Sequence, residues 1–245
     1  MKTLSEIRTE ARKSLTGKWG KGALIVLVYS LITYAISWVL AFIPVVGSIC
    51  SLVIELPITY GFLISMVKLK RGEEIGYVDF LTIGFTSFAK VWTVFGNILL
   101  KMIIPVILYV VSVILIVVGV GLLISQGTSA LIIIGYILLL VASIWATIKG
   151  LYYAPSFFIL YDNPDMSGKE IVEESEKIMT GNRFRFFVLP LTFIGWILLC
   201  GLTLGIGSLW LTPYMMVSMV VFYESIAGTK SNVEATAEPT ETPAE

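Results

Sequence analysis

Four charged residues lie within or beside long apolar stretches, where an ionisable side chain is costly and usually has a function or a partner. They are Glu55, Lys101, Lys149 and Glu224. A carboxyl group at position 55 could couple a proton to transport or contact a cation. The alternative is a protonated glutamic acid, hydrogen-bonded between two helices to a serine or threonine. The sequence leaves both readings of Glu55 open and favours the hydrogen-bonded one.

The two lysines depend on where the third apolar helix enters the membrane. If it enters near Val91, Lys101 lies about 15 Å deep and could reach Glu55. If it enters at Pro105, Lys101 and Lys149 both lie at the membrane boundary and extend their amines to the headgroups. The second placement is favoured, because it avoids two buried lysines and leaves stretches of about 20 residues to cross the membrane.

Prolines recur in the predicted membrane helices after the first. Each proline lacks the N–H that would bond the carbonyl four residues earlier, so each can bend its helix. A transporter could use such bends as hinges, but prolines are common in membrane helices and static kinks are the favoured interpretation. The candidate hinges are Pro57, Pro105, Pro155, Pro190 and Pro213.

Other kinds of chemistry find little support. The chain has no histidine, which removes the commonest general base and metal ligand. Its two cysteines, Cys50 and Cys200, lie in apolar surroundings and form neither a disulfide framework nor a zinc motif. We therefore expect no catalytic residue, no metal and no cofactor, and we expect the protein not to be an enzyme. A formal net charge of zero gives no reason to expect a nucleic-acid partner.

The composition indicates the elements that position these residues. Of the 245 residues, 57% are hydrophobic and 14% are charged, whereas soluble domains have about 25% charged residues. Most of the chain must therefore face lipid or other membrane helices. We predict an all-α polytopic membrane protein whose six transmembrane helices form three parallel repeats, each an amphipathic helix followed by a helical hairpin.

The boundaries follow from alternating charged and apolar segments. Thr3 with Glu6 and Ser167 with Glu170 are capping boxes that start two amphipathic helices, and the first of these helices is expected to lie on the membrane surface. The predicted order is an amphipathic helix at 1–22, a hairpin at 23–69, an amphipathic segment at 70–90, a longer hairpin at 91–161, an amphipathic helix at 162–182, a hairpin at 183–227 and a disordered acidic tail at 228–245.

Charge position predicts the orientation. The three turns that connect the paired apolar stretches contain no lysine or arginine, whereas basic residues gather in or near the charged segments. Basic residues stay on the cytoplasmic side, so we expect both termini in the cytosol. The motifs Leu15-Thr16-Gly17, Phe85-Thr86-Ser87 and Met179-Thr180-Gly181 occupy similar places in the three units and favour the repeat.

Several longer motifs resemble a known family. They are Leu15-Thr16-Gly17-Lys18-Trp19, SEKIMTGN at 175–182, FIGW at 193–196, LGIGSLWLTPY at 204–214 and FYE at 222–224. Together they resemble the bacterial integral membrane proteins catalogued as domain of unknown function 975, over everything except the acidic tail. The family is similar, more distantly, to the membrane region of some glycerophosphodiester phosphodiesterases. The resemblance implies a topology and a bacterial source, and it carries no enzymatic activity to this chain.

Two functional hypotheses follow. The leading one is a non-catalytic protein of the bacterial inner membrane that interacts with the lipid bilayer, with another membrane protein or with itself, because amphipathic helices on one side of the membrane offer docking faces. The alternative is a transporter or exporter of a small or amphipathic solute, including a role in protection against membrane-active peptides. The proline bends and Glu55 favour this alternative, whereas the small number of polar residues in the apolar stretches disfavours it.

Overall fold

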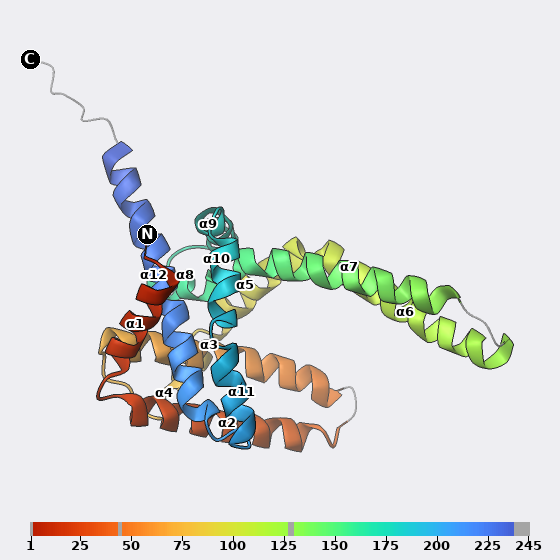
Figure 1. The fold of residues 1–245 in the computed structure, drawn as a ribbon, viewed down its shortest axis with the longest axis horizontal. Helices are drawn as coiled ribbons and strands as arrows, with labels where there is room; N and C mark the ends of the chain where they lie inside the picture. Colours follow the sequence, from red (N-terminus) through yellow and green to blue (C-terminus); the bar gives the residue numbers. More distant parts are fainter. Residues whose placement is uncertain (1, 44–45, 127–129, 238–245) are drawn as a thin grey trace, which may run out of the picture.

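A computed structural model describes residues 2–43, 46–126 and 130–237, and within these ranges the chain is helical and contains no strand. The helices are α1 Leu4–Leu15, α2 Trp19–Leu40, α3 Val46–Arg71, α4 Asp79–Thr86, α5 Phe88–Lys101, α6 Ile103–Gln126, α7 Ala130–Tyr153, α8 Ser156–Asp162, α9 Gly168–Met179, α10 Arg183–Leu191, α11 Ile194–Leu202 and α12 Ser208–Ala237 (Figure 1).

Six segments of the described chain are long and apolar enough to cross a membrane. They are Trp19–Leu40, Val46–Arg71, Ile103–Ser125, Ala130–Asp162, Arg183–Leu202 and Ser208–Gly228. This confirms the predicted all-α class with six candidate spans. A seventh arises only if α4 and α5, which are bent by 67° relative to one another, cross the membrane as one broken unit. The arrangement of the hairpins as parallel repeats stays a prediction.

Helices α1 and α9 share their local architecture. Each has 12 residues and begins at the predicted capping box. The Thr3 N–H donates to the Glu6 carboxylate at 2.6 Å and the Ser167 N–H to the Glu170 carboxylate at 2.8 Å. These backbone bonds, with those of the capping hydroxyls, lower the pKa of both glutamates. Both helices end at a Thr-Gly pair whose glycine has a φ near +80° (77° and 83°), a conformation that glycine adopts without strain.

The buried core lies around α12 and the second half of α3. Helices α1, α4 and α9 surround these two helices and turn their apolar side chains inward (Figure 1). Ile7, Ala11 and Leu15 of α1 are fully buried. Protein therefore covers the apolar face of α1, where the sequence alone suggests lipid, and the position of this helix relative to the membrane surface stays a prediction. Its apolar stripe suits a protein groove as well as it suits lipid, and here α12 and α3 provide the groove.

Two glycines let α3 and α4 approach closely. A Cβ atom at Gly61 would lie 1.9 Å from the carbonyl oxygen of Phe80, and a Cβ at Gly84 would lie 2.2 Å from that of Pro57. No side chain fits at either position without moving the backbone. The close contact holds Phe80 fully buried against α3, and it fixes α4 beside the first hairpin.

The second hairpin, α6 with α7, extends away from the rest of the molecule (green in Figure 1). Its two helices pack on each other where Gly135 meets Ile116 and the carbonyl of Ser112. Only 11% of each of these two spans is buried within the chain. Most of the apolar surface of this hairpin therefore faces outward.

The prolines occupy different kinds of positions. Pro57, Pro190 and Pro213 lie inside helices. Pro105 lies in the first turn of α6, and Pro155 is the N-cap residue of α8. At such starting positions the missing N–H has no intrahelical partner to lose, so proline begins a helix rather than bending one. The long third apolar stretch is accordingly divided at Met102, between α5 and α6.

The remaining turns and the end of the chain complete the fold. The turn before α12 contains Gly205 with a φ of 87°, in agreement with the predicted reversal at this glycine-rich stretch. Helix α12 continues beyond Gly228, where the sequence predicts a disordered tail, as far as Ala237. Residues 238–245 of that tail lie outside the described residues, as do residues 44–45 and 127–129 between the paired helices of the first two predicted hairpins.

Candidate functional site

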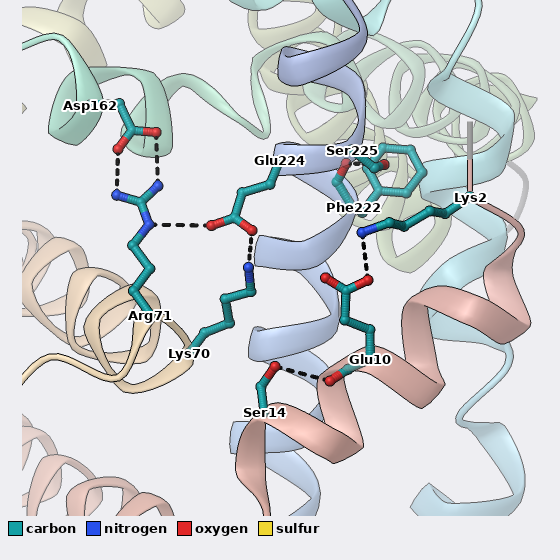
Figure 2. Close-up of polar contacts among 9 residues, drawn as sticks. All are labelled: Lys2, Glu10, Ser14, Lys70, Arg71, Asp162, Phe222, Glu224 and Ser225. Carbon is teal, nitrogen blue, oxygen red and sulfur yellow. Dashed lines mark hydrogen bonds and ion pairs between the residues drawn. The ribbon is translucent and has the colours of Figure 1, made fainter.

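Three helices meet at a group of charged side chains shown in Figure 2, which we name the charged junction: Lys70 and Arg71 of α3, Asp162 of α8 and Glu224 of α12. The two terminal nitrogens of Arg71 donate to the two oxygens of Asp162 at 2.7 and 3.1 Å. The Nε atom of Arg71 donates to Glu224 at 3.2 Å, and Lys70 pairs with the other oxygen of the same carboxylate. The junction therefore balances two cations against two carboxylates.

Aromatic residues complete the charged junction. The Tyr223 hydroxyl donates to Asp162 at 3.1 Å, and its ring stacks on Phe158. The guanidinium of Arg71 also lies 5.7 Å from the centre of the Tyr161 ring. Two-point pairing fixes the orientation of an arginine more firmly than a single contact does. The charged side chains are only 16–30% exposed, so water screens them less than it screens surface pairs.

The members of the charged junction come from corresponding places. Each lies near the end of the second long segment of a predicted hairpin: α3 in the first, α8 after α7 in the second and α12 in the third. The charged junction thus joins one helix from each of the three predicted units. The charged junction is suited to holding these helices together, because its charged side chains are paired with one another and none of them is placed to act as a nucleophile.

Lys101 lies beside Glu176 and not beside Glu55, which it could reach if the third apolar helix entered the membrane near Val91. Its amine is 3.3 Å from Glu176 of α9. The hydroxyl of Tyr153 donates to the other oxygen of Glu176 at 2.6 Å. These contacts join the end of α5 to α7 and α9, and they leave Lys101 away from Glu55, with 42% of its side chain exposed.

Lys149 lies near a second cation. Its amine is 6.0 Å from the centre of the Tyr152 ring, and the guanidinium of Arg183 is 4.3 Å from the centre of the same ring. Neither of them takes part in an ion pair among the described residues. Two positive charges therefore share one aromatic ring without a carboxylate between them.

Glu55 lies between the two helices of the first hairpin. The Ser37 hydroxyl of α2 donates to the Glu55 carboxyl of α3 at 2.5 Å. This is the kind of interhelical hydrogen bond that the favoured reading of Glu55 describes. Tyr29 and Thr59 make a similar contact nearer the other end of the same hairpin, at 3.1 Å.

The sequence singles out some of these residues and misses their partners. The sequence identifies Glu224 as a candidate site residue without indicating its partners. It does not identify Arg71, Asp162, Glu176 or Arg183. A signal was present, because each lies at the first or last turn of an element next to an apolar segment. Such positions let a charged head remain near water while its stem packs on apolar surface. Within the described ranges, no group of three or more histidine, cysteine or acidic side chains is arranged to hold a metal ion.

Comparison with known proteins assigns the chain to one family. Nothing among curated proteins or solved structures matches it. The family model described as protein of unknown function (DUF975) matches residues 1–230, which include every residue of the charged junction. On the strength of this match over nearly the whole length, the chain belongs to the DUF975 family.

Proposed function

We propose that this protein is a non-catalytic component of a bacterial inner membrane that interacts with lipid or with another membrane protein through its α6–α7 hairpin. Both termini are placed in the cytosol in this proposal, because the connecting turns lack basic residues. The parallel repeat is part of the same proposal. It is supported by the matching architecture of α1 and α9 and by the charged junction, to which each unit contributes.

The single observation that carries the proposal is the outward apolar surface of the second hairpin. Ile114 of α6 is 54% exposed and Leu140 of α7 is 64% exposed, whereas Ala142 of α7 is 1% exposed and faces the partner helix. The rest of the molecule packs around α3 and α12 and needs little of this hairpin for its core. A large exposed apolar surface on a membrane helix pair is available to lipid or to a protein partner.

Spin labels on the reconstituted full chain test the proposal. With Cys50 and Cys200 replaced by serine, a label at Leu140→Cys should collide with dissolved oxygen and be shielded from a water-soluble nickel chelate. A label at the matched buried position, Ala142→Cys, should be shielded from both reagents. Shielding from both at Leu140 would favour coverage by a second copy of the chain. Free access of the nickel chelate to Leu140 would overturn the proposal.

The transporter hypothesis keeps one specific observation in its favour. Glu55 is an ionisable side chain within a candidate span, two positions before Pro57 inside the same helix. Ionisable side chains within membrane helices mark proton and ion pathways in pumps and transporters. The contact with Ser37 supplies a structural reason for the same residue, and the hydrogen bond and the transport role predict different behaviour for Glu55→Gln.

A further inference from the structure

An apolar groove lies between α7 and α10, with a volume of about 720 Å³. Ser143, Ile144, Thr147, Ile148 and Leu151 line it from α7, and Phe184 and Phe187 line it from α10. The α7 residues recur at intervals of three or four, so they form one continuous face of that helix. The groove therefore runs along the axis of a membrane helix, which is the direction of an acyl chain in a bilayer.

Positive charge lies beside this groove. Arg183 lines the groove itself, and Lys149 directly follows the lining residue Ile148 and lies against the same Tyr152 ring as Arg183. The two cations cannot be further apart than the sum of their distances to that ring centre. Like charges this close repel one another in a medium less polar than water. An anion placed between them would relieve the repulsion and accept charge-assisted hydrogen bonds.

From these two features we infer that the groove is a binding site for an anionic phospholipid, with the phosphate near Arg183 and Lys149 and an acyl chain along α7. This inference rests on the proposed function and specifies the class of lipid that the protein binds. A phospholipid meets both requirements at once, because it joins a negative headgroup to a long apolar chain. Basic pockets between membrane helices on the cytoplasmic side are a recurrent headgroup site.

The lining residues fit this occupant better than they fit a soluble anion. Phe184 is 75% exposed and Phe187 is 40% exposed at the mouth of the groove, and aromatic side chains at this level suit the membrane interface. Ser143 and Thr147 give their hydroxyl hydrogens to carbonyls of their own helix, so they present the groove with no free donor. A small phosphate would gain the contacts of Arg183 and Lys149 and nothing from the apolar walls.

Native mass spectrometry of the full chain in detergent micelles tests the inference. Phosphatidylglycerol and phosphatidylcholine with identical acyl chains are added, and bound lipids are counted. We expect phosphatidylglycerol to bind several-fold more tightly. Arg183→Gln and Lys149→Gln should each weaken phosphatidylglycerol binding by about fivefold and leave phosphatidylcholine binding unchanged. The control Lys169→Gln, on an exposed face of α9 with a 75% exposed side chain, should change neither.

A second pair of measurements separates the headgroup from the chain. Thr147→Trp places a large side chain in the groove, keeps both cations in the chain and should reduce the binding of both lipids. Glycerol 3-phosphate, which has the phosphate and no acyl chain, should fail to displace phosphatidylglycerol. Equal binding of the two lipids, or displacement by glycerol 3-phosphate alone, would overturn the inference. If the spin label at Leu140 still reports lipid in that case, the proposed function survives without this site.

Discussion

Arg71, at the end of α3, forms a two-point ion pair with Asp162, which lies 91 positions later at the end of α8. The pair connects the first predicted hairpin to the second, and the contact of Arg71 with Glu224 extends the connection to the third. One guanidinium therefore connects the first unit to the second and the third, near the ends of their second candidate spans.

Breaking this pair should destabilise the protein. Asp162→Asn removes one carboxylate charge and leaves the charge of Arg71 partly uncompensated. The side chains of Arg71 and Asp162 are too enclosed for water to screen this interaction fully. We expect a loss of about 1–2 kcal/mol, between the values for exposed and buried ion pairs. Thermal unfolding in detergent micelles measures it. The matched control, Glu173→Gln, breaks the exposed pair with Lys169 and should cost about 0.5 kcal/mol or less. Equal melting temperatures for both variants would contradict a bracing role for the junction.

Gly61 should not accept alanine. The added Cβ would overlap the backbone of α4, so the two helices must separate, at a cost of about 1–3 kcal/mol or more. Gly96 of α5 is the matched control, since a Cβ there meets no atom within 4 Å. Gly96→Ala should stabilise the chain by about 0.5–1 kcal/mol through helix propensity. If Gly61→Ala melted at the wild-type temperature, the close packing of α3 on α4 would be refuted.

The capping boxes predict a dependence of stability on pH. Glu6 and Glu170 have lowered pKa values in the folded chain, relative to an ordinary value of 4.5. Their contribution is therefore present above pH 4.5 and is lost as the pH falls through the lowered folded values. The difference in melting temperature between pH 6 and pH 3 should be smaller in Glu170→Gln than in the wild type. Glu173→Gln, on the same helix but outside the capping box, should leave that difference unchanged.

Glu55→Gln separates the structural reading from proton coupling. The glutamine can still accept the hydrogen bond from Ser37, so stability should change by less than about 0.5 kcal/mol, whereas Ser37→Ala leaves the carboxyl without its partner and should cost about 1 kcal/mol or more. A glutamine carries no titratable proton. Loss of an ion-driven solute flux in a folded Glu55→Gln variant would therefore favour the transporter, and an unchanged flux would exclude proton coupling at this position.

The proposed topology is tested by cysteine labelling in intact cells. On a background free of Cys50 and Cys200, single cysteines replace Ser5, Gln126 and Ser231. An impermeant reagent should label only Gln126→Cys, because the other two positions are proposed to lie in the cytosol. Labelling of Ser231→Cys without permeabilisation would mean an odd number of crossings or an inverted protein.

Local features of the sequence were sufficient to predict the helical class, the six spans and both capping boxes. These features depend on the hydropathy of about 20 neighbouring residues or on side chains three positions apart. The burial of α1 was not predictable in the same way. A stripe such as Ile7, Ala11 and Leu15 is equally apolar whether lipid or α12 covers it, and only the packing of distant segments decides between them.

The residues of the candidate site were likewise predictable only where the local sequence was enough. Glu224 and Lys101 could be identified as charged residues beside apolar segments, but nothing in the local sequence pairs Arg71 with Asp162 or Lys101 with Glu176. Such partners depend on how whole hairpins pack. The division of the long third apolar stretch did carry a local signal, because proline is tolerated best in the first turn of a helix. Pro105 therefore favours a helix that starts close before it, and α6 begins at Ile103.

The burial of α1 under α12 has a consequence for the order in which the protein is made. The Tyr214 hydroxyl donates to the carbonyl of Arg8 across 206 positions, so α1 leaves the ribosome long before its covering helix exists. At a synthesis rate of about 5–20 residues per second, the delay is about 10–40 s. During that interval Ile7, Ala11 and Leu15 have only the α3 side of their groove to occupy. A nascent chain halted before α12 would thus keep an exposed apolar stripe, ready for a membrane surface or a chaperone.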